Sequence, residues 1–201
     1  MATSDAHLGS ADHPATATGL DNRKLAMWAF LGSECLFFGA LISTFLLYRE
    51  RVPEGGVRPE DVYDIPFTSV SSFVLLMSSL TMVLALAAIQ RGDHRQLRIW
   101  LVATAGLGMV FIAGQIFEFT AFIEHGFTMR SSVSGSAFFV LTGFHGAHVT
   151  VGILMLLVMA MFSAAGRLTQ EHTMRIEMLG LYWHFVDIVW VVIFTLVYLI
   201  P

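Results

Sequence analysis

Five long apolar segments constrain the fold of this 201-residue chain more than any other feature. A helix that crosses the hydrocarbon core of a bilayer needs about 20 mostly apolar residues. Only 13% of the residues are charged and 56% are hydrophobic, which leaves too few polar side chains to cover a soluble core. The sequence therefore predicts an all-α polytopic membrane helical bundle rather than a soluble enzyme. We expect five transmembrane helices, over about residues 25–47, 67–89, 97–122, 136–164 and 178–200.

The parts of the chain between these segments are short and polar. Pro53, Pro59 and Gly92 are typical of turns and loops. No such part is long enough to form a domain, so we divide the chain into a polar cytoplasmic tail (1–24) and a five-helix transmembrane domain (25–201). The net charge is −4 and no cluster of Lys or Arg is present, so nucleic acid is not an expected partner.

The distribution of cationic residues predicts the orientation of the helices. Seven of the eleven Lys and Arg residues lie in the tail and in the second and fourth connections, and four lie on the opposite side. Connections rich in Lys and Arg stay in the cytoplasm. We therefore expect a cytoplasmic N-terminus and a C-terminus outside.

A few polar residues lie inside the apolar segments, where an ionisable group costs about 2.5–3.5 kcal/mol on insertion scales. Each of them needs a physical explanation, because lipid offers no hydrogen-bond partner. The set consists of Glu34, Gln115, Glu118, His145, His148, His184 and Asp187.

Glu34 lies in the first apolar segment without a cation beside it in the sequence. We expect its carboxyl group to be uncharged at neutral pH, or paired with a polar group of another helix. Two roles stay open at this point. The group loads or relays protons, or it forms a hydrogen bond that holds two helices together.

The other polar residues form pairs spaced three apart, so each pair shares one helix face. The pairs are Gln115 with Glu118, His145 with His148, and His184 with Asp187. This pattern predicts carboxylates that meet imidazoles across helix interfaces, and a proton pathway is the second interpretation.

Small and aromatic residues beside these pairs suggest contact sites. Gly143 and Ala147 have the small-xxx-small spacing that lets helices approach closely. Trp183 and Trp190 lie seven apart on one face, and Trp190 is too deep for the membrane interface. We assign these four residues to helix packing or lipid contact.

A metal or haem site is the alternative use of the histidines. Di-iron bundles use Glu-x-x-His on paired helices, and no apolar segment here contains that motif. Only His145, His148 and His184 lie within the segments, whereas a transmembrane dihaem site needs four axial ligands. We expect no metal in this chain, and a metalloenzyme that uses these three histidines stays an alternative.

Two motifs identify a family. The sequence over residues 135–149 (Gly-Ser-Ala-Phe-Phe-Val-Leu-Thr-Gly-Phe-His-Gly-Ala-His-Val) and over 182–190 (Tyr-Trp-His-Phe-Val-Asp-Ile-Val-Trp) resembles subunit III of the haem–copper terminal oxidases in its short, five-helix form. Glu34 matches the family's carbodiimide-reactive glutamate. Residues 114–118 resemble its Gln-x-x-Glu-Tyr segment, with Phe119 in the tyrosine position. The resemblance covers about residues 27–199.

The resemblance implies an accessory role in the prokaryotic plasma membrane. Such a subunit packs on oxidase subunit I, beside further subunits including subunit II, and carries no redox centre; haem and copper belong to the partner subunits. It holds phospholipid and supports proton uptake while the complex reduces O₂ to water and pumps protons. Longer members have two extra N-terminal helices that form one wall of a lipid cleft, so we expect any cleft here to be completed by another subunit or to be absent.

Three readings of the function follow. The preferred one is a subunit of a cytochrome c oxidase in the aerobic respiratory chain, because residues 142–146 and 182–187 are more similar to the cytochrome c-oxidising members of the family. The same subunit in a quinol-oxidising enzyme is the alternative. A stand-alone transporter or proton channel, with Glu34, Glu118 and Asp187 as a relay, is a further one.

Overall fold

A computed structural model describes residues 21–52 and 63–200 as five long helices. They are α1 (Asn22–Tyr48), α2 (Ile65–Gln90), α3 (His94–Glu124), α4 (Val133–Ala164) and α5 (Thr173–Ile193). A short 3-10 turn, η2 (Gln170–His172), precedes α5, and a π-helical segment, η3 (Phe194–Leu199), continues it. All five are long and apolar enough to cross a membrane. This confirms the predicted all-α fold and the predicted number of spanning helices.

The helices extend beyond the apolar segments because polar residues cap them. Asp21, Asp64, Asp93 and Ser132 each accept a hydrogen bond from a backbone N–H of the first turn that follows. As a result α1 already begins at Asn22, inside the expected tail. The rest of that tail, residues 1–20, lies outside the described residues.

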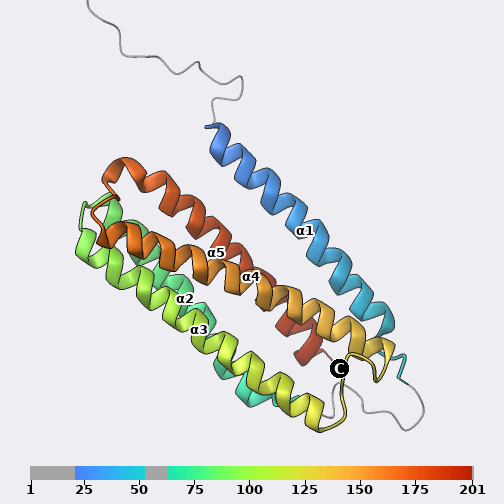
Figure 1. Ribbon diagram of the computed structural model, residues 1–201. Helices are drawn as coiled ribbons and strands as arrows, with labels where there is room; N and C mark the ends of the chain where they lie inside the picture. The colour runs from blue at the N-terminus through green and yellow to red at the C-terminus, as the bar shows by residue number, and fades with distance from the viewer. Residues whose placement is uncertain (1–20, 53–62, 201) are drawn as a thin grey trace, which may run out of the picture.

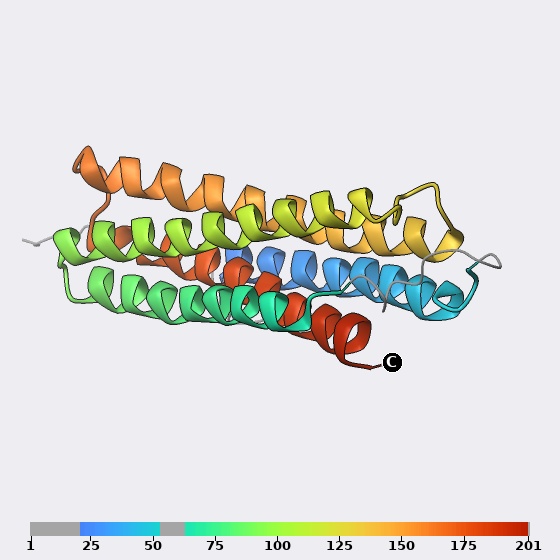
Figure 2. The ribbon, with the colours of Figure 1, turned by 90° about the horizontal axis from the view of Figure 1, so that it is seen from below.

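The helices alternate in direction along the chain. Figures 1 and 2 show the α2–α3 and α4–α5 connections at one end of the bundle and the α3–α4 connection at the other. Lys24 at the start of α1 forms a 2.8 Å ion pair with Glu177 near the start of α5. Arg49 at the other end donates a hydrogen bond to the carbonyl of Ile200. Helices α1 and α5 therefore run parallel.

Helix α5 occupies the centre of the molecule. The others form an arc in the order α2, α3, α4, α1, and α5 packs inside it against α2, α4 and α1. Over its most apolar stretch 56% of α5 is buried, against 17% of α1. Helix α1 lies at the open edge of the arc, where α4 and α5 contact it.

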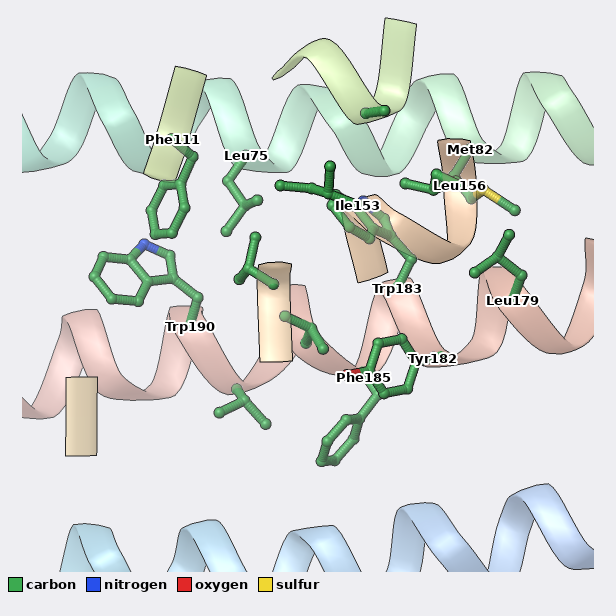
Figure 3. Packing of buried hydrophobic residues seen from close by; sticks show 14 of the residues in the cluster. Leu75, Met82, Phe111, Ile153, Leu156, Leu179, Tyr182, Trp183, Phe185 and Trp190 are labelled. Carbon is green, nitrogen blue, oxygen red and sulfur yellow. The ribbon is translucent and has the colours of Figure 1, made fainter. Parts of the chain in front are cut away.

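Buried aromatic residues fill the centre. Figure 3 shows Trp183 and Trp190 pointing from α5 towards α2 and α3, whereas Tyr182 and Phe185 point to the opposite side, towards α1. Both tryptophans are almost fully buried. Helix α5 thus presents one aromatic face to the main bundle and another to α1.

Candidate functional site

Glu34 and His148 join α1 to α4. The Glu34 Oε2 atom lies 3.2 Å from His148 Nε2, and both side chains are about four-fifths buried. His148 Nδ1 lies 2.7 Å from the carbonyl oxygen of Phe144. Because a carbonyl oxygen only accepts, Nδ1 carries a proton, and Nε2 shares a second proton with the carboxyl group. Glu34 is thus paired with a polar group of another helix.

The pair lies beside a groove of about 1020 Å³ between α1, α4 and α5. Arg23 and Arg175 line the groove near the starts of α1 and α5. Glu34 lines it about three turns further along α1, where it faces His148 of α4. Most of the wall between them is apolar, and five methionines contribute to it: Met27, Met155, Met159, Met174 and Met178. A groove is thus present in the chain, and its completion by another subunit stays a prediction. Three helices of the chain itself form the groove because α1 stands at the open edge of the arc.

Gln115 connects α3 to α4. Its side-chain amide donates a 3.1 Å hydrogen bond to the carbonyl oxygen of Thr142. A Cβ atom at Gly146 would lie 2.8 Å from Gln115 Oε1, so the glycine makes room for this side chain. Gln115 therefore holds a close contact between the two helices.

Glu118 shares the buried face of Gln115, as the spacing predicted, but does not meet an imidazole. The Thr68 hydroxyl of α2 lies 2.6 Å from its Oε1 atom, and the Tyr198 hydroxyl donates to Oε2 at 3.4 Å. The π-helical segment η3 carries Tyr198. The prediction of a carboxylate–imidazole pair is wrong here, because the neighbouring helices present hydroxyl groups at this depth.

His145 packs against aromatic rings. It is fully buried, and its ring stacks on Trp190 with centroids 4.9 Å apart. Phe111 approaches the ring edge-on at 5.9 Å. Neither ring nitrogen has a hydrogen-bond partner among residues 21–52 and 63–200. The expected interhelical hydrogen bond of this histidine is therefore not formed within the described chain.

His184 of α5 contacts a serine of α2, and Asp187, one turn further along α5, does not meet an imidazole of the described chain. His184 Nδ1 lies 2.5 Å from the Ser79 hydroxyl. Asp187 is buried, and neither of its carboxyl oxygens has a well-formed hydrogen bond within the described ranges.

The two tryptophans of α5 pack against α2 and are hydrogen-bonded to it. Trp183 Nε1 donates to the Ser78 hydroxyl at 2.9 Å, and Trp190 Nε1 donates to the Ser72 hydroxyl at 2.8 Å. Glycines make room for the Trp183 ring, because a Cβ atom at Gly108 or Gly152 would lie 2.7 or 2.8 Å from it. Both indoles are therefore fixed in the bundle by hydrogen bonds and close packing.

Gly143 and Ala147 do not mediate contact between helices of this chain. Both lie on an exposed face of α4, and no atom lies within 4 Å of a Cβ atom built at Gly143. The prediction of close helix approach is wrong for this pair within the chain. Ala147 instead lines the groove between α1, α4 and α5. Contact of these residues with lipid or with a second chain stays a prediction.

Sequence reasoning missed the polar face of α2. Its hydroxyl groups contact Glu118, Trp190, Trp183 and His184, although serine and threonine carry no charge to draw notice. The pattern that indicates them is their helical spacing within an apolar segment, since small hydroxyl residues in such helices commonly form interhelical hydrogen bonds. The residues concerned are Thr68, Ser72, Ser78 and Ser79.

The three histidines considered as metal ligands lie in separate surroundings. His148 faces Glu34, His184 faces Ser79, and His145 stacks on Trp190. Within the described ranges, no three His, Cys, Asp or Glu residues come close enough to hold a metal ion. The geometry thus gives no support to a metalloenzyme that uses these three histidines.

Fold and site together define an integral membrane protein. Its five apolar helices carry few ionisable groups, and among these Glu34 contacts His148, while Glu118 and His184 contact hydroxyl groups. The sequence over residues 4–200 matches the family described as Cytochrome c oxidase subunit III. The chain belongs to this family, in its five-helix form.

Curated relatives divide between two types of terminal oxidase. The chain is 35% identical to a cytochrome c oxidase subunit 3 of Bacillus sp. (strain PS3), over 89% of this chain and 86% of the relative. It is 37% identical to a quinol oxidase subunit 3 of Bacillus spizizenii, over 87% and 85%. It is also 37% identical to a cytochrome bo(3) ubiquinol oxidase subunit 3 of Pseudomonas aeruginosa, over 97% and 93%. The chain is therefore a subunit of a haem–copper terminal oxidase.

Proposed function

We propose that the chain is an accessory subunit of a proton-pumping cytochrome c oxidase in a prokaryotic plasma membrane, with its N-terminus in the cytoplasm. In this proposal it packs on the catalytic subunit I, while subunits I and II carry haem and copper. One observation supports the accessory role above others. The buried ionisable groups are used in contacts between helices, and the hydrogen bonds of the described chain do not link Glu34, Glu118 and Asp187 into a relay.

A mild-detergent affinity purification tests this proposal. The tagged chain is expected to bring haem-bearing partners with it, so that the eluate shows a haem absorption spectrum and consumes O₂. A colourless, monomeric chain that moves protons by itself in liposomes would contradict the proposal and favour the transporter.

The electron donor is a separate part of the proposal. Relatives of both kinds are similar to this chain, and we assign cytochrome c on the motifs at 142–146 and 182–187. The purified complex is expected to oxidise reduced cytochrome c, and the neighbouring gene for subunit II to encode a copper-binding set of Cys and His. Oxidation of quinol alone would replace this assignment with the quinol-oxidising alternative.

The groove between α1, α4 and α5 supports the lipid-holding part of the role. Its apolar wall suits an acyl chain, since flexible methionine side chains adapt to irregular shapes. Arg23 and Arg175 near one end suit a phosphate headgroup. Extracted complexes are expected to retain phospholipid, and Val151→Trp, which fills the groove, is expected to reduce the retained amount without removing the subunit.

A role of Glu34 in proton uptake is tested by Glu34→Gln. The amide keeps a hydrogen bond to His148 Nε2 but cannot carry the shared proton. If the carboxyl group assists proton uptake, the variant complex is expected to show an altered pH dependence of turnover with the subunit still bound. An unchanged pH profile would restrict Glu34 to joining α1 and α4.

A further inference from the structure

A second pocket lies at the opposite end of the bundle from Arg23 and Arg175. It has a volume of about 590 Å³, and its walls come from the residues after α1 and from the start of α4. The lining residues are Arg51, Val52, Arg130, Ser132, Val133 and Ser136. These six residues take no part in the buried contacts between helices described above. The packing of the helices therefore does not explain why two arginines line the same pocket.

Both guanidinium groups have unused hydrogen-bonding capacity. Arg51 stacks over the Tyr48 ring at 5.1 Å, which leaves the N–H groups in its plane free to donate. Arg130 is exposed, and its backbone N–H rather than its guanidinium group donates to the Thr128 hydroxyl at 3.3 Å. Neither side chain forms an ion pair with a carboxylate of the described chain. Two cations that share a pocket repel each other, and without a counter-charge from the described residues 21–52 and 63–200 they favour an anion between them.

The start of α4 adds to the positive potential of the pocket. Ser132 caps this 32-residue helix and accepts a hydrogen bond from the Gly135 N–H at 2.8 Å. The N-terminal end of a long helix attracts negative charge, and the Val133 N–H belongs to the first turn. Ser136 also lines the pocket, but its hydroxyl group donates to the backbone carbonyl oxygen of Met129 and adds no donor for an anion. The pocket thus combines two forked donors with a helix end, a set of donors that suits phosphate oxygens.

The position of the pocket favours the phosphate of a phospholipid headgroup over a free phosphate ion. It lies between the last residues after one spanning helix and the first turn of another, which is where a chain that spans the membrane meets the lipid headgroups. Val52 and Val133 line it with apolar surface, and Val133 is exposed. A free anion gains nothing from such surface, whereas the glycerol and first methylene groups of a phospholipid do.

We propose that Arg51, Arg130 and the first turn of α4 bind the headgroup phosphate of an anionic phospholipid. This site lies in the leaflet opposite to the groove that Arg23 and Arg175 line. The proposal requires only that the chain spans the membrane, and it holds for either electron donor. If the lipid fails to bind here while the purified complex stays assembled and active, the headgroup site is wrong and the proposed function stands.

Native mass spectrometry of the delipidated oxidase complex tests the site with phosphatidylglycerol. The double variant Arg51→Gln/Arg130→Gln is expected to bind it at least about tenfold more weakly, because two charge-assisted hydrogen bonds are lost. The matched control Arg91→Gln/Arg95→Gln removes two exposed arginines at the other end of the bundle and is expected to leave this binding unchanged. Equal binding by the two double variants would overturn the proposal.

Inorganic phosphate distinguishes the two sources of the anion. Millimolar phosphate is expected to leave phosphatidylglycerol bound, because it lacks the apolar part that Val52 and Val133 contact. Complete displacement of the lipid by phosphate would overturn the assignment to a headgroup. If the double variant does not retain the subunit, the single variant Arg130→Gln serves instead, with an expected loss of at least about threefold, and unchanged binding would again contradict the proposal.

Discussion

At the scale of single residues, the centre of the bundle depends on contacts between very small and very large side chains. Glycines at positions 108 and 152 make room for the Trp183 ring, and Ser78 accepts the hydrogen bond of its indole. Such contacts tolerate little change, because protein interiors are packed as densely as organic crystals. Single methyl or hydroxyl groups are therefore expected to have measurable effects here.

Gly152→Ala is expected to destabilise the folded chain by about 1–3 kcal/mol, because the added Cβ atom would lie 2.8 Å from the Trp183 ring. The control is Gly143→Ala on the same helix, where no atom lies within 4 Å of the added group. Thermal unfolding of the purified complex, followed through tryptophan fluorescence, compares the two. A melting temperature lowered equally by both substitutions would contradict the packing described for Trp183.

Ser78→Ala is expected to cost about 1–3 kcal/mol, because it leaves the buried Trp183 N–H without an acceptor. Ser69→Ala on the same helix is the control, since this exposed hydroxyl is bonded to the carbonyl of Ile65 in its own helix. The same unfolding measurement applies. An unchanged melting temperature for Ser78→Ala would mean that the indole finds another acceptor.

At the scale of helices, α1 differs from the other four. It contacts α4 and α5 at the open edge of the arc, and the Glu34–His148 and Lys24–Glu177 pairs tie it there. The side chains of Lys24 and Glu177 are each about one-third exposed, and ion pairs near the surface contribute about 0–1 kcal/mol to the free energy of unfolding. The buried pair is therefore the stronger electrostatic link between α1 and the rest of the bundle.

Glu34→Leu is expected to loosen α1 from α4, since His148 Nε2 then lies largely buried without a partner, at a cost of about 1–3 kcal/mol. Glu34→Gln keeps a hydrogen-bond donor and is expected to cost less than half as much. Thermal unfolding of the two variant complexes measures the difference. A larger loss with Gln than with Leu would show that the pair does not join the helices through this hydrogen bond.

At the scale of the whole molecule, the alternating helices place positive charge unevenly between the two ends. Arg23 and Lys24 lie in the first turn of α1, and the pair of Lys24 with Glu177 places them beside the start of α5. The α2–α3 and α4–α5 connections at this end carry further arginines. That end is the expected cytoplasmic side. The end with Arg51 and Arg130, where we place the headgroup site, then faces outwards.

Cysteine labelling on intact cells measures this orientation. In a Cys35→Ser background without native cysteine, Arg130→Cys is expected to react with a membrane-impermeant maleimide, and Arg91→Cys only after the cells are opened. The reverse pattern would invert the orientation that we propose. It would also place the headgroup site in the cytoplasmic leaflet.

The sequence by itself determined the number of spanning helices, their approximate limits, the family and the small set of polar residues inside the membrane. These features are local: a run of about 20 apolar residues forms a helix in lipid because its backbone hydrogen bonds are satisfied within the segment. The i, i+3 spacing likewise showed that Gln115 and Glu118 share a buried face. A helix face depends only on sequence distance, so these predictions needed no knowledge of neighbouring helices.

Only the tertiary structure decided which partner each polar residue meets. Glu118 contacts Thr68 and Tyr198 rather than a histidine, and His145 stacks on Trp190. The partner of a side chain depends on the rotation, depth and separation of two helices that are distant in sequence, and hydroxyl groups satisfy a buried polar group as well as charged ones do. The groove beside Glu34 and the pocket of Arg51 and Arg130 arise in the same way, because each lies between helices that the sequence separates.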